Sequence, residues 1–390
     1  MKGVLKDRRL YVIFSITVVS VMGVASLTPA FPKMSEVLHL SRVEVGWLIS
    51  AFTFPGIFLT PFAGIIADRW GRKTVLVPSL IIFAVSGFSL FFVHKFEWMV
   101  ALRFLQGVGA ASLGSINGTL IGDFFKGPQR PEAMGYNAGV LSFFTALYPL
   151  VGGALAGFSW YFPFLLPLLA IPVALFLIFG IEEPSIDNPT DFKSYFKSMA
   201  DAMLKKNVIA IFVLSILTFV ILYGALITYI PFLMKQKFNL SAPMIGVVIS
   251  LSSVASVIVS TRVGALTKKY GSANLLKVAF ILYAVANVLF PMFNHLFLFI
   301  IPVLFFGVAQ ALNMPSLQTL LLNIAPENLR GAFMSINGMS LRIGQTIGPF
   351  IVGVGYALGG VYGAYFLAAA IALVGLVLTF TAIAKVDVKK

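Results

Sequence analysis

"GIIADRWGRK", residues 64–73, places four charged side chains within six positions of a chain that is otherwise strongly apolar. The 390 residues are 59% hydrophobic and only 11% charged. Ordinary soluble domains carry about 25% charged residues. The composition therefore predicts a protein embedded in lipid, and the charged stretch marks a point at which the chain leaves the apolar phase.

Apolar runs near or above the ~20 residues that cross a bilayer recur along the chain, separated by short charged or Pro/Gly-rich segments. Helices are expected, because strands of transmembrane barrels are about ten residues long and alternate in polarity. The prediction is an all-α membrane protein with twelve transmembrane helices. The predicted spans are 11–32, 43–66, 75–93, 98–122, 134–157, 163–181, 208–232, 243–265, 277–293, 297–323, 332–357 and 362–384.

Positive charges are unevenly divided between the segments that join these spans. Twenty of the 28 Lys and Arg residues fall on the side that holds residues 64–73, and five fall on the other side. The positive-inside rule then places both termini in the cytoplasm and the chain in the inner (cytoplasmic) membrane. The net charge of +14 is thus explained by topology, and no nucleic-acid partner is expected.

Several chemistries lack the residues that they need. The chain has no cysteine, so disulfides, thiol catalysis and Cys-based metal sites are excluded. Its histidines, His39, His94 and His295, lie in outer loops or at span ends, and we expect no metal and no cofactor. Without a GxxxxGK[ST] phosphate loop or a cluster of mid-span acids and histidines, neither ATP-driven transport nor a membrane enzyme is expected.

An internal repeat divides the chain. At an offset of 200 in residue number the same residue types recur, with the pairs Gly46/Gly246, Ser50/Ser250, Gly71/Gly271, Gly107/Gly307, Arg130/Arg330 and Pro149/Pro349. The repeat predicts two six-helix bundles, 1–181 and 208–390. The joining segment 182–207 carries aromatic and Met residues at helical spacing, which favours a helix on the inner membrane face; the alternative is a solvated linker.

Duplicated six-helix halves suit alternating access around a site near the membrane midplane. The chain resembles the major facilitator superfamily over nearly its whole length, and within it the twelve-helix drug:proton antiporters. The opening stretch is similar to the superfamily's signature between helices 2 and 3. The matching residues are Gly64, Asp68, Arg69, Gly71, Arg72 and Lys73. The resemblance implies a secondary transporter that works as a monomer.

The signature loop has a physical reading. Gly71 permits a tight turn, and Asp68 can face a helix N-terminus while the cations stay at the inner surface. The resemblance implies that Asp68 contacts the start of helix 11 when the inner gate is shut. In the second copy Lys268 stands in place of Asp68, so this latch would be one-sided. The alternative is that the charges only anchor the loop.

A second resemblance is "RFLQGVGAA", residues 103–111, in which Arg103, Gln106, Gly107 and Gly109 fit the family's helix 4 signature. A buried arginine costs roughly 2.5 kcal/mol or more on insertion scales, so it needs polar partners or a watery cavity. The resemblance links this arginine to proton movement. The alternative is a structural role, with Arg103 bonded to carbonyls of helix 1.

Two departures count against antiport. In helix 5, "ALYPLVGG" (146–153) has Tyr148 where the family pattern shows glycine before proline, whereas helix 11 carries "GQTIGPFIVG" (344–353). None of the fourteen acids falls mid-span, so proton coupling has no obvious carboxylate. Asp123, at the inner end of helix 4, either pairs with loop arginines or carries protons, and Glu44 is expected to cap helix 2 with Ser41.

Arg342 suggests the chemistry of the transport site. It follows Arg330 by twelve residues, which at 1.5 Å per residue puts it about 18 Å into the membrane. Together with Arg103 it would make the central cavity electropositive and favour anionic or zwitterionic solutes. Alternatively, Arg342 pairs with helix carbonyls or reaches an interface. The other candidate wall residues are Gln106, Tyr148, Tyr223, Tyr229, Gln310, Asn313 and Gln345.

These observations predict a secondary active transporter that exports amphiphilic small molecules by alternating access, with protons as the candidate coupled ion. The runner-up is a carrier for organic anions or metabolites that uses the electropositive cavity. A membrane-embedded receptor or scaffold without transport is a third reading from another class.

Overall fold

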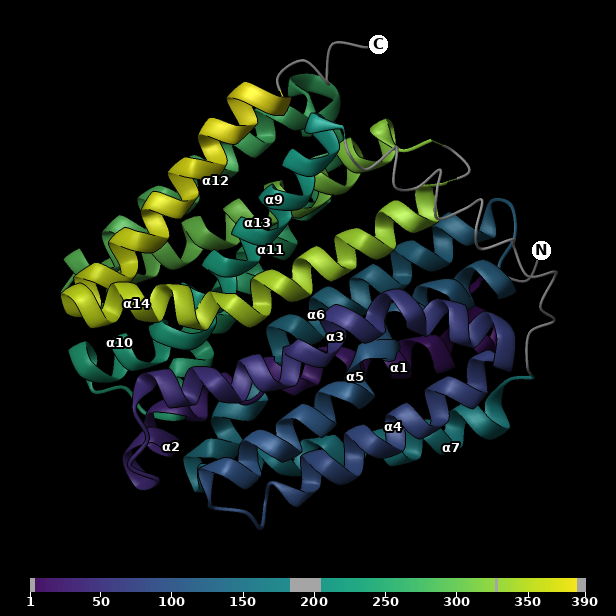
Figure 1. Ribbon diagram of the computed structural model, residues 1–390, viewed down its shortest axis with the longest axis horizontal. Coiled ribbons are helices and arrows are strands. Elements are labelled where there is room, and N and C mark those ends of the chain that lie inside the picture. The colour runs from purple at the N-terminus through teal and green to yellow at the C-terminus, as the bar shows by residue number, and fades with distance from the viewer. Residues whose placement is uncertain (1–3, 183–204, 327–328, 384–390) are drawn as a thin grey trace.

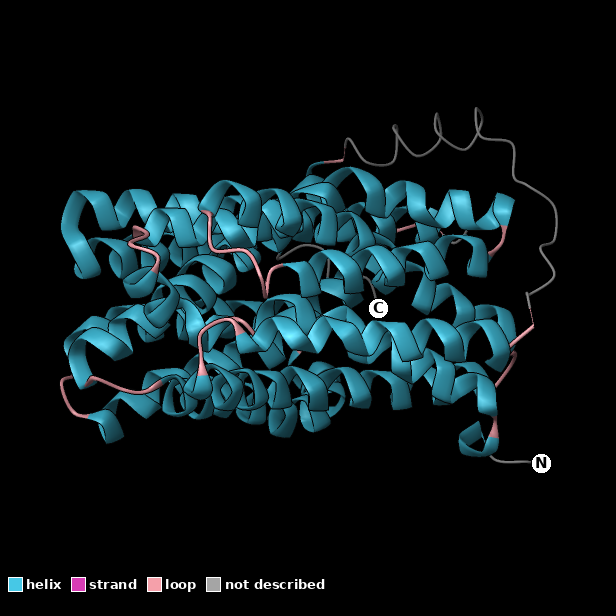
Figure 2. Cartoon of the chain, turned by 90° about the horizontal axis from the view of Figure 1, so that it is seen from below, coloured by secondary structure: helices cyan, strands magenta, loops and turns pink. Residues whose placement is uncertain are grey.

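The computed structural model describes residues 4–182, 205–326 and 329–383. The regular elements within these ranges are helical, and they run roughly parallel to the long axis of the molecule with loops gathered at its ends (Figure 2). This confirms the predicted all-α fold. Eleven helices of the described residues are long and apolar enough to cross a membrane.

The helices form two bundles, coloured purple to teal and green to yellow in Figure 1. The first contains α1 (Arg8–Ala25), α2 (Phe31–Val37), α3 (Arg42–Trp70), α4 (Arg72–Ser89), α5 (Phe96–Phe124), α6 (Gln129–Phe158) and α7 (Ala170–Gly180), with short 3₁₀ segments η1 (Val4–Lys6), η2 (Thr28–Ala30) and η3 (Phe162–Leu169). The second contains α9 (Lys206–Ile221), the π-helical η4 (Leu222–Tyr229), α10 (Ile230–Phe238), α11 (Ala242–Tyr270), α12 (Ser272–Met292), α13 (Leu296–Ile324), α14 (Arg330–Leu378) and the π-helical η6 (Thr379–Ile383).

The last two predicted spans lie in one long element. Helix α14 runs through both, but Gly359 and Gly360 leave helical geometry at its bend, and Gly360 has a φ of +58°. Only glycine adopts such a φ without steric strain. The eleven helices thus account for the twelve predicted spans.

Local signals in the sequence set the helix ends. Ser41 and Glu44 form the expected capping box at the start of α3. Gly71 (φ +97°) and Gly271 (φ +81°) make equivalent turns after α3 and α11. At the start of α1, the carboxylate of Asp7 accepts hydrogen bonds from the backbone and side chain of Arg9, which lower the pKa of that carboxyl.

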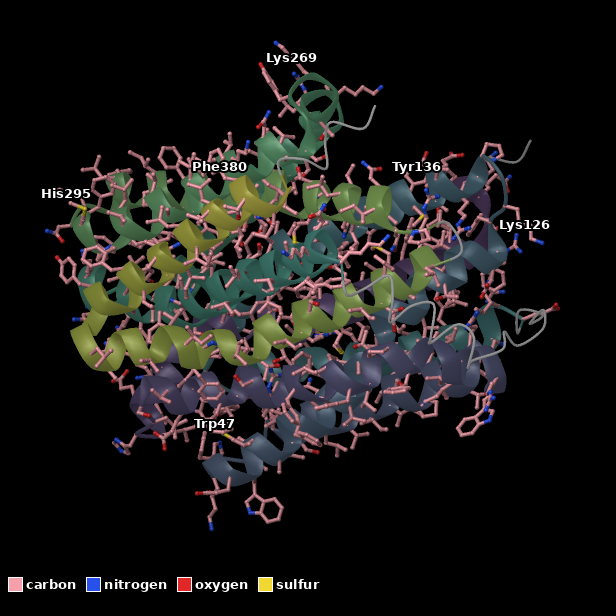
Figure 3. The ribbon with its side chains drawn as sticks, turned by 45° about the horizontal axis from the view of Figure 1, so that its top comes forward. Trp47, Lys126, Tyr136, Lys269, His295 and Phe380 are labelled. Carbon is pink, nitrogen blue, oxygen red and sulfur yellow. The ribbon has the colours of Figure 1, made fainter. Side chains whose placement is uncertain are left out.

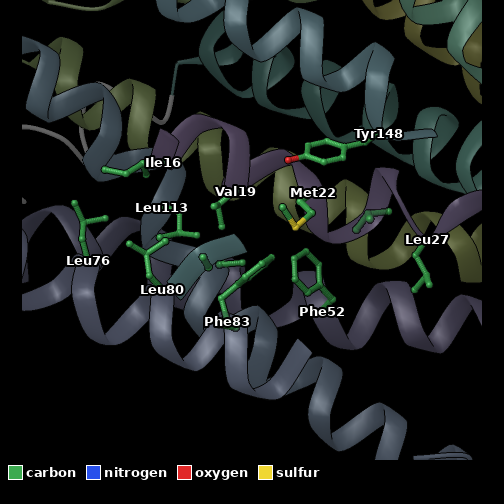
Figure 4. Close-up of a cluster of buried hydrophobic side chains, with 14 of the residues drawn as sticks. Ile16, Val19, Met22, Leu27, Phe52, Leu76, Leu80, Phe83, Leu113 and Tyr148 are labelled. Carbon is green, nitrogen blue, oxygen red and sulfur yellow. The ribbon is translucent and has the colours of Figure 1, made fainter. Parts of the chain in front are cut away.

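Each bundle has its own apolar interior. The core of the first is shown in Figure 4, where Ile16, Val19 and Met22 of α1 face Leu80 and Phe83 of α4. A separate buried cluster fills the second bundle. The limits 1–181 and 208–390 stay predictions, as does the helix within 182–207, because residues 183–204 lie outside the described ranges.

Two labelled residues mark the two ends of the molecule. Lys126, in the loop between α5 and α6, lies at one end, which we call the basic side. His295 lies at the opposite end, which we call the far side (Figure 3). The orientation of these sides in a membrane, with both termini cytoplasmic, stays a prediction.

Close helix contacts in the first bundle depend on glycine, which has no side chain. A Cβ added at Gly107 on α5 would lie 2.1 Å from the carbonyl oxygen of Phe52 on α3. A Cβ added at Gly114, two turns further along the same helix, would meet nothing within 4 Å.

We therefore expect Gly107→Ala to destabilise the protein by forcing α3 and α5 apart, whereas Gly114→Ala should be neutral or stabilising by up to about 1 kcal/mol through helix propensity. Thermal unfolding in detergent, followed by circular dichroism, measures both. Equal melting temperatures for the two variants would contradict the tight α3–α5 contact.

Candidate functional site at the bundle interface

The two bundles are joined on the far side by a matched pair of hydrogen bonds. The hydroxyl of Ser50 on α3 donates to the carbonyl of Thr346 on α14 at 2.6 Å. The hydroxyl of Ser250 on α11 donates to the carbonyl of Ala146 on α6 at 2.7 Å. The two donors occupy equivalent positions of the internal repeat, as do the two acceptors, so the repeat places the same contact twice.

Close packing surrounds both bonds. A Cβ added at Gly46 would lie 3.1 Å from Cβ of Pro349, and one added at Gly246 would lie 2.1 Å from the carbonyl oxygen of Pro149. These four residues are again two equivalent pairs of the repeat. We call the α3–α14 and α6–α11 contacts, defined by Gly46, Ser50, Pro149, Ala146, Gly246, Ser250, Thr346 and Pro349, the two seams.

Arg42 closes the far end of one seam. Its guanidinium lies 4.5 Å from the ring centroid of Tyr356 and 5.4 Å from that of Phe232, and it donates to Oε1 of Gln236 at 3.0 Å. Nearby, Trp47 (labelled in Figure 3) meets Phe350 edge to face with centroids 4.7 Å apart. Both contacts join the first bundle to the second.

Arg103 lies inside the first bundle, with only 2% of its surface exposed. It donates to the carbonyls of Gly23 on α1 (2.9 Å) and Leu48 on α3 (3.0 Å) and to Oε1 of Gln106 (2.8 Å). Its guanidinium also lies 4.3 Å from the ring centroid of Phe52. The bond to the carbonyl of Gly23 is the contact with helix 1 that a structural role of Arg103 requires. Yet Nη2 is buried without a hydrogen-bond partner among the described residues.

Arg342 sits at the boundary between the bundles. Its Nη1 donates to Oε1 of Gln345 one turn along α14, at 3.1 Å. A Cβ added at Gly56 on α3 would lie 2.9 Å from its Cδ and Nε, so the side chain crosses to the first bundle. The phenol of Tyr223, in the π-helical η4, lies close enough to the guanidiniums of Arg342 and Arg103 to interact electrostatically with both. Insertions of this π-helical kind often occur at functional sites.

Matched polar pairs hold the helices that line the interface. On α1, Thr17 donates to Oδ1 of Asn137 on α6 at 2.6 Å and accepts from Asn117 on α5. In the second bundle Ser215 donates to Asn337 at 2.8 Å, and Thr218 donates to Asn313 at 3.1 Å. Asn137 and Asn337 are also equivalent positions of the repeat.

The other predicted wall residues point in different directions. Tyr148 donates to the carbonyl of Val18 within the first bundle at 2.9 Å. Tyr229 packs beside Tyr356 within the second bundle, and Gln310 is half-buried on α13. The hydroxyl of Tyr148 is thus engaged in this conformation. Tyr223 packs against the cores of both bundles, and Arg342 with its partner Gln345 lies at the boundary between them. Arg103 and Gln106 bond each other inside the first bundle.

The signature loop is described in part. Arg72 is buried and forms an ion pair with Asp123, with Nε 3.0 Å from Oδ2, so the expected partner of Asp123 is a loop arginine. The surroundings of Gly64 and of the Asp68 side chain lie outside what the structure describes, and Arg69 is exposed at the end of α3. The latch between Asp68 and helix 11 therefore stays a prediction.

Sequence reasoning assigned no role to Ser50, Ser250, Arg42 or Phe52. A signal for the two serines was present, because both belong to the repeat, where a polar residue held at the same position of two apolar helices indicates a shared contact. Arg42 and Phe52 carry no such signal. Their partners come from elements that are distant in the sequence.

Comparison with known proteins identifies the fold. The sequence model described as Major Facilitator Superfamily matches residues 13–241 and 221–390. The chain belongs to the major facilitator superfamily. It is therefore a multi-pass membrane transporter of small-molecule substrates, in agreement with the resemblance found in the sequence.

Two similar relatives are bacterial resistance proteins. Multidrug resistance protein 2 of Bacillus subtilis is 26% identical over 386 residues, covering 97% of this chain and 96% of the relative. Quinolone resistance protein NorA of Staphylococcus aureus is 25% identical over 356 residues, covering 89% of each. A bacterial homologue of the lysosomal transporter Spinster, solved inward-facing and occupied, shares the fold with a TM-score of 0.78 at 15% identity, covering 96% of both chains.

If the seams hold this superfamily member closed on the far side, Ser50→Ala and Ser250→Ala should each weaken one seam. A hydrogen bond of about 1 kcal/mol corresponds to about a fivefold rise in the ratio of far-side-open to far-side-closed molecules. Spin labels on Val37→Cys and Met244→Cys, in a chain without native cysteine, report the far-side distance.

The matched control is Ser89→Ala, because Ser89 donates only within its own helix, to the carbonyl of Val85. Its distance distribution should equal that of the parent. An unequal response of the two seam variants would contradict the equivalence of the seams, and no response in either would contradict their role.

Proposed function

We propose that this superfamily member exports amphiphilic small molecules by alternating access across the inner membrane, as a monomer. The observation that carries the proposal is the pair of seams. They join the bundles through equivalent short contacts on the far side, a geometry that lets the bundles separate there as two rigid units. The multidrug and quinolone resistance relatives, each aligned over most of this chain, support drug-like amphiphiles as substrates.

Reconstitution tests this proposal. Proteoliposomes loaded with fluorescent amphiphilic dyes are followed with and without an imposed pH gradient. We expect protein-dependent movement of several dyes, accelerated by the gradient if protons are the coupled ion. Protein that binds dyes but gives no flux above that of protein-free vesicles would favour a receptor or scaffold instead.

A second candidate function is a carrier for organic anions. The observation that favours it is two guanidiniums without a carboxylate partner, that of Arg103 inside the first bundle and that of Arg342 at the boundary between the bundles. Among the described residues, Nη2 of Arg103 is buried without a hydrogen-bond partner, and Arg342 bonds only the neutral amide of Gln345. Neither has a carboxylate among these partners, so no bonded anion of the described residues neutralises either guanidinium. Two such charges in low-dielectric surroundings attract anions.

Arg342 offers the sharper test of the two, because Arg103 also holds its bundle together. We expect Arg342→Gln to insert and fold, yet to lose preference for anionic over cationic substrates of similar size. Arg342→Lys should keep part of the preference, since lysine retains the charge but lacks the planar fork that binds carboxylates in bidentate fashion. Competition between matched anionic and cationic dyes measures it.

Unchanged selectivity in Arg342→Gln, or a parent protein that prefers lipophilic cations, would remove the organic-anion candidate. The export proposal would then stand without it. Proton coupling and the one-sided latch at Asp68 belong to the same proposal, and the imposed pH gradient tests the first of them.

A further inference from the structure

A groove runs between the two bundles on the basic side of the α6–α11 seam. It has a volume of about 550 Å³ and is lined by these two helices alone. Ala146, whose carbonyl accepts the seam bond from Ser250, also lines the groove, so the groove adjoins the seam. Other lining residues are Gly139, Ser142, Phe143, Leu150, Val254 and Ile258.

The depth of the groove places it in hydrocarbon. Helix α6 has 30 residues and α11 has 29, which at 1.5 Å per residue is about 45 Å for each. This exceeds the ~30 Å of a bilayer's hydrocarbon core. The groove is formed by residues between 138 and 150 of α6 and between 254 and 261 of α11, which are the middle parts of both helices. Its contents therefore belong to the apolar phase.

The lining is apolar and uncharged. Phe143 and Ile258 expose 60% and 64% of their surfaces. The hydroxyls of Ser260 and Thr261 donate to carbonyls of their own helix, at 2.7 Å and 2.8 Å, and need no partner from outside. Such a surface binds an alkyl or aryl group and offers no polar partner to a charged group.

We propose that the groove holds the apolar tail of a transported amphiphile. This inference rests on the proposed export function, and it names the part of the substrate that α6 and α11 would bind. The head group would then lie outside the groove, whose lining offers it no charged partner.

The position of the walls favours a transported tail over other occupants. The walls belong to different bundles, so a lipid or a partner helix held there permanently would fix the separation of the bundles and oppose their movement. A flexible tail enters and leaves with each cycle.

Gly139 allows the groove to be filled without disturbing the fold, because a Cβ added there would meet nothing within 4 Å. The probes are two zwitterionic sulfobetaines with the same head group, one with a butyl and one with a decyl tail, in proteoliposomes. We expect Gly139→Phe to lower kcat/KM for the decyl probe relative to the butyl probe by about tenfold, as loss of an apolar pocket contact does.

The matched control is Gly135→Phe, one turn away on the same helix, where an added Cβ also meets nothing within 4 Å. It should leave the ratio of the two probes unchanged. An unchanged ratio in Gly139→Phe, or the same fall in both variants, would overturn the inference while leaving export intact. A parent protein that moves the dyes but neither probe would overturn this inference and leave export intact, whereas one that moves neither dyes nor probes would overturn both.

A binding measurement keeps the inference testable if Gly139→Phe does not fold. In the cysteine-free chain, Ser142→Cys places one thiol in the groove and Ser89→Cys places one on α4, away from it. We expect the decyl probe, and not the butyl probe, to slow labelling of Ser142→Cys by a membrane-permeant maleimide. Slowing at both sites, or labelling of Ser142→Cys that neither probe changes because a lipid already fills the groove, would overturn the inference.

Discussion

The contact between the bundles on the far side depends on helices whose backbones touch. In lipid, helices gain no hydrophobic energy by meeting, so association relies on dispersion at short range and on interhelical hydrogen bonds. The seams supply both. Gly246 brings α11 against the carbonyl of Pro149, and Ser250 then reaches a backbone acceptor of α6. A larger residue at either position would separate the helices and remove both contributions.

The two bundles share a backbone plan but differ in how they are held internally. In the first, Arg103 ties α5 to carbonyls of α1 and α3. The equivalent position of the second bundle is Val303, a buried apolar residue that offers no such bonds. The second bundle has instead the π-helical η4, in which Thr228 donates to the carbonyl of Tyr223. The buried arginine is therefore not repeated in the second bundle, whereas the seam contacts are repeated.

The sequence predicts the spans, the repeat and the caps, because apolar length, residue identity at a fixed offset and local capping can all be read along the chain itself. It does not predict the partner of Ser50, since Thr346 belongs to the other bundle and is far from Ser50 in the sequence. It also misses how Tyr148 and Tyr229 point, because that depends on the rotation of each helix within its bundle. The signature loop was recognised by its residues, yet Asp68 itself lies among the side chains that the structure does not describe.

Uncharged groups supply most of the contacts that close the far side. These contacts consist of hydroxyl–carbonyl bonds, glycine–proline packing and an arginine held by aromatic rings and an amide. The two seams consist of serine, threonine, alanine, glycine and proline, none of which has an acidic or basic side chain. The strength of the seams is then the same in acidic and alkaline surroundings. A membrane pH gradient would have to be sensed elsewhere in the molecule, which separates the part that shuts the transporter from the part that could respond to its energy source.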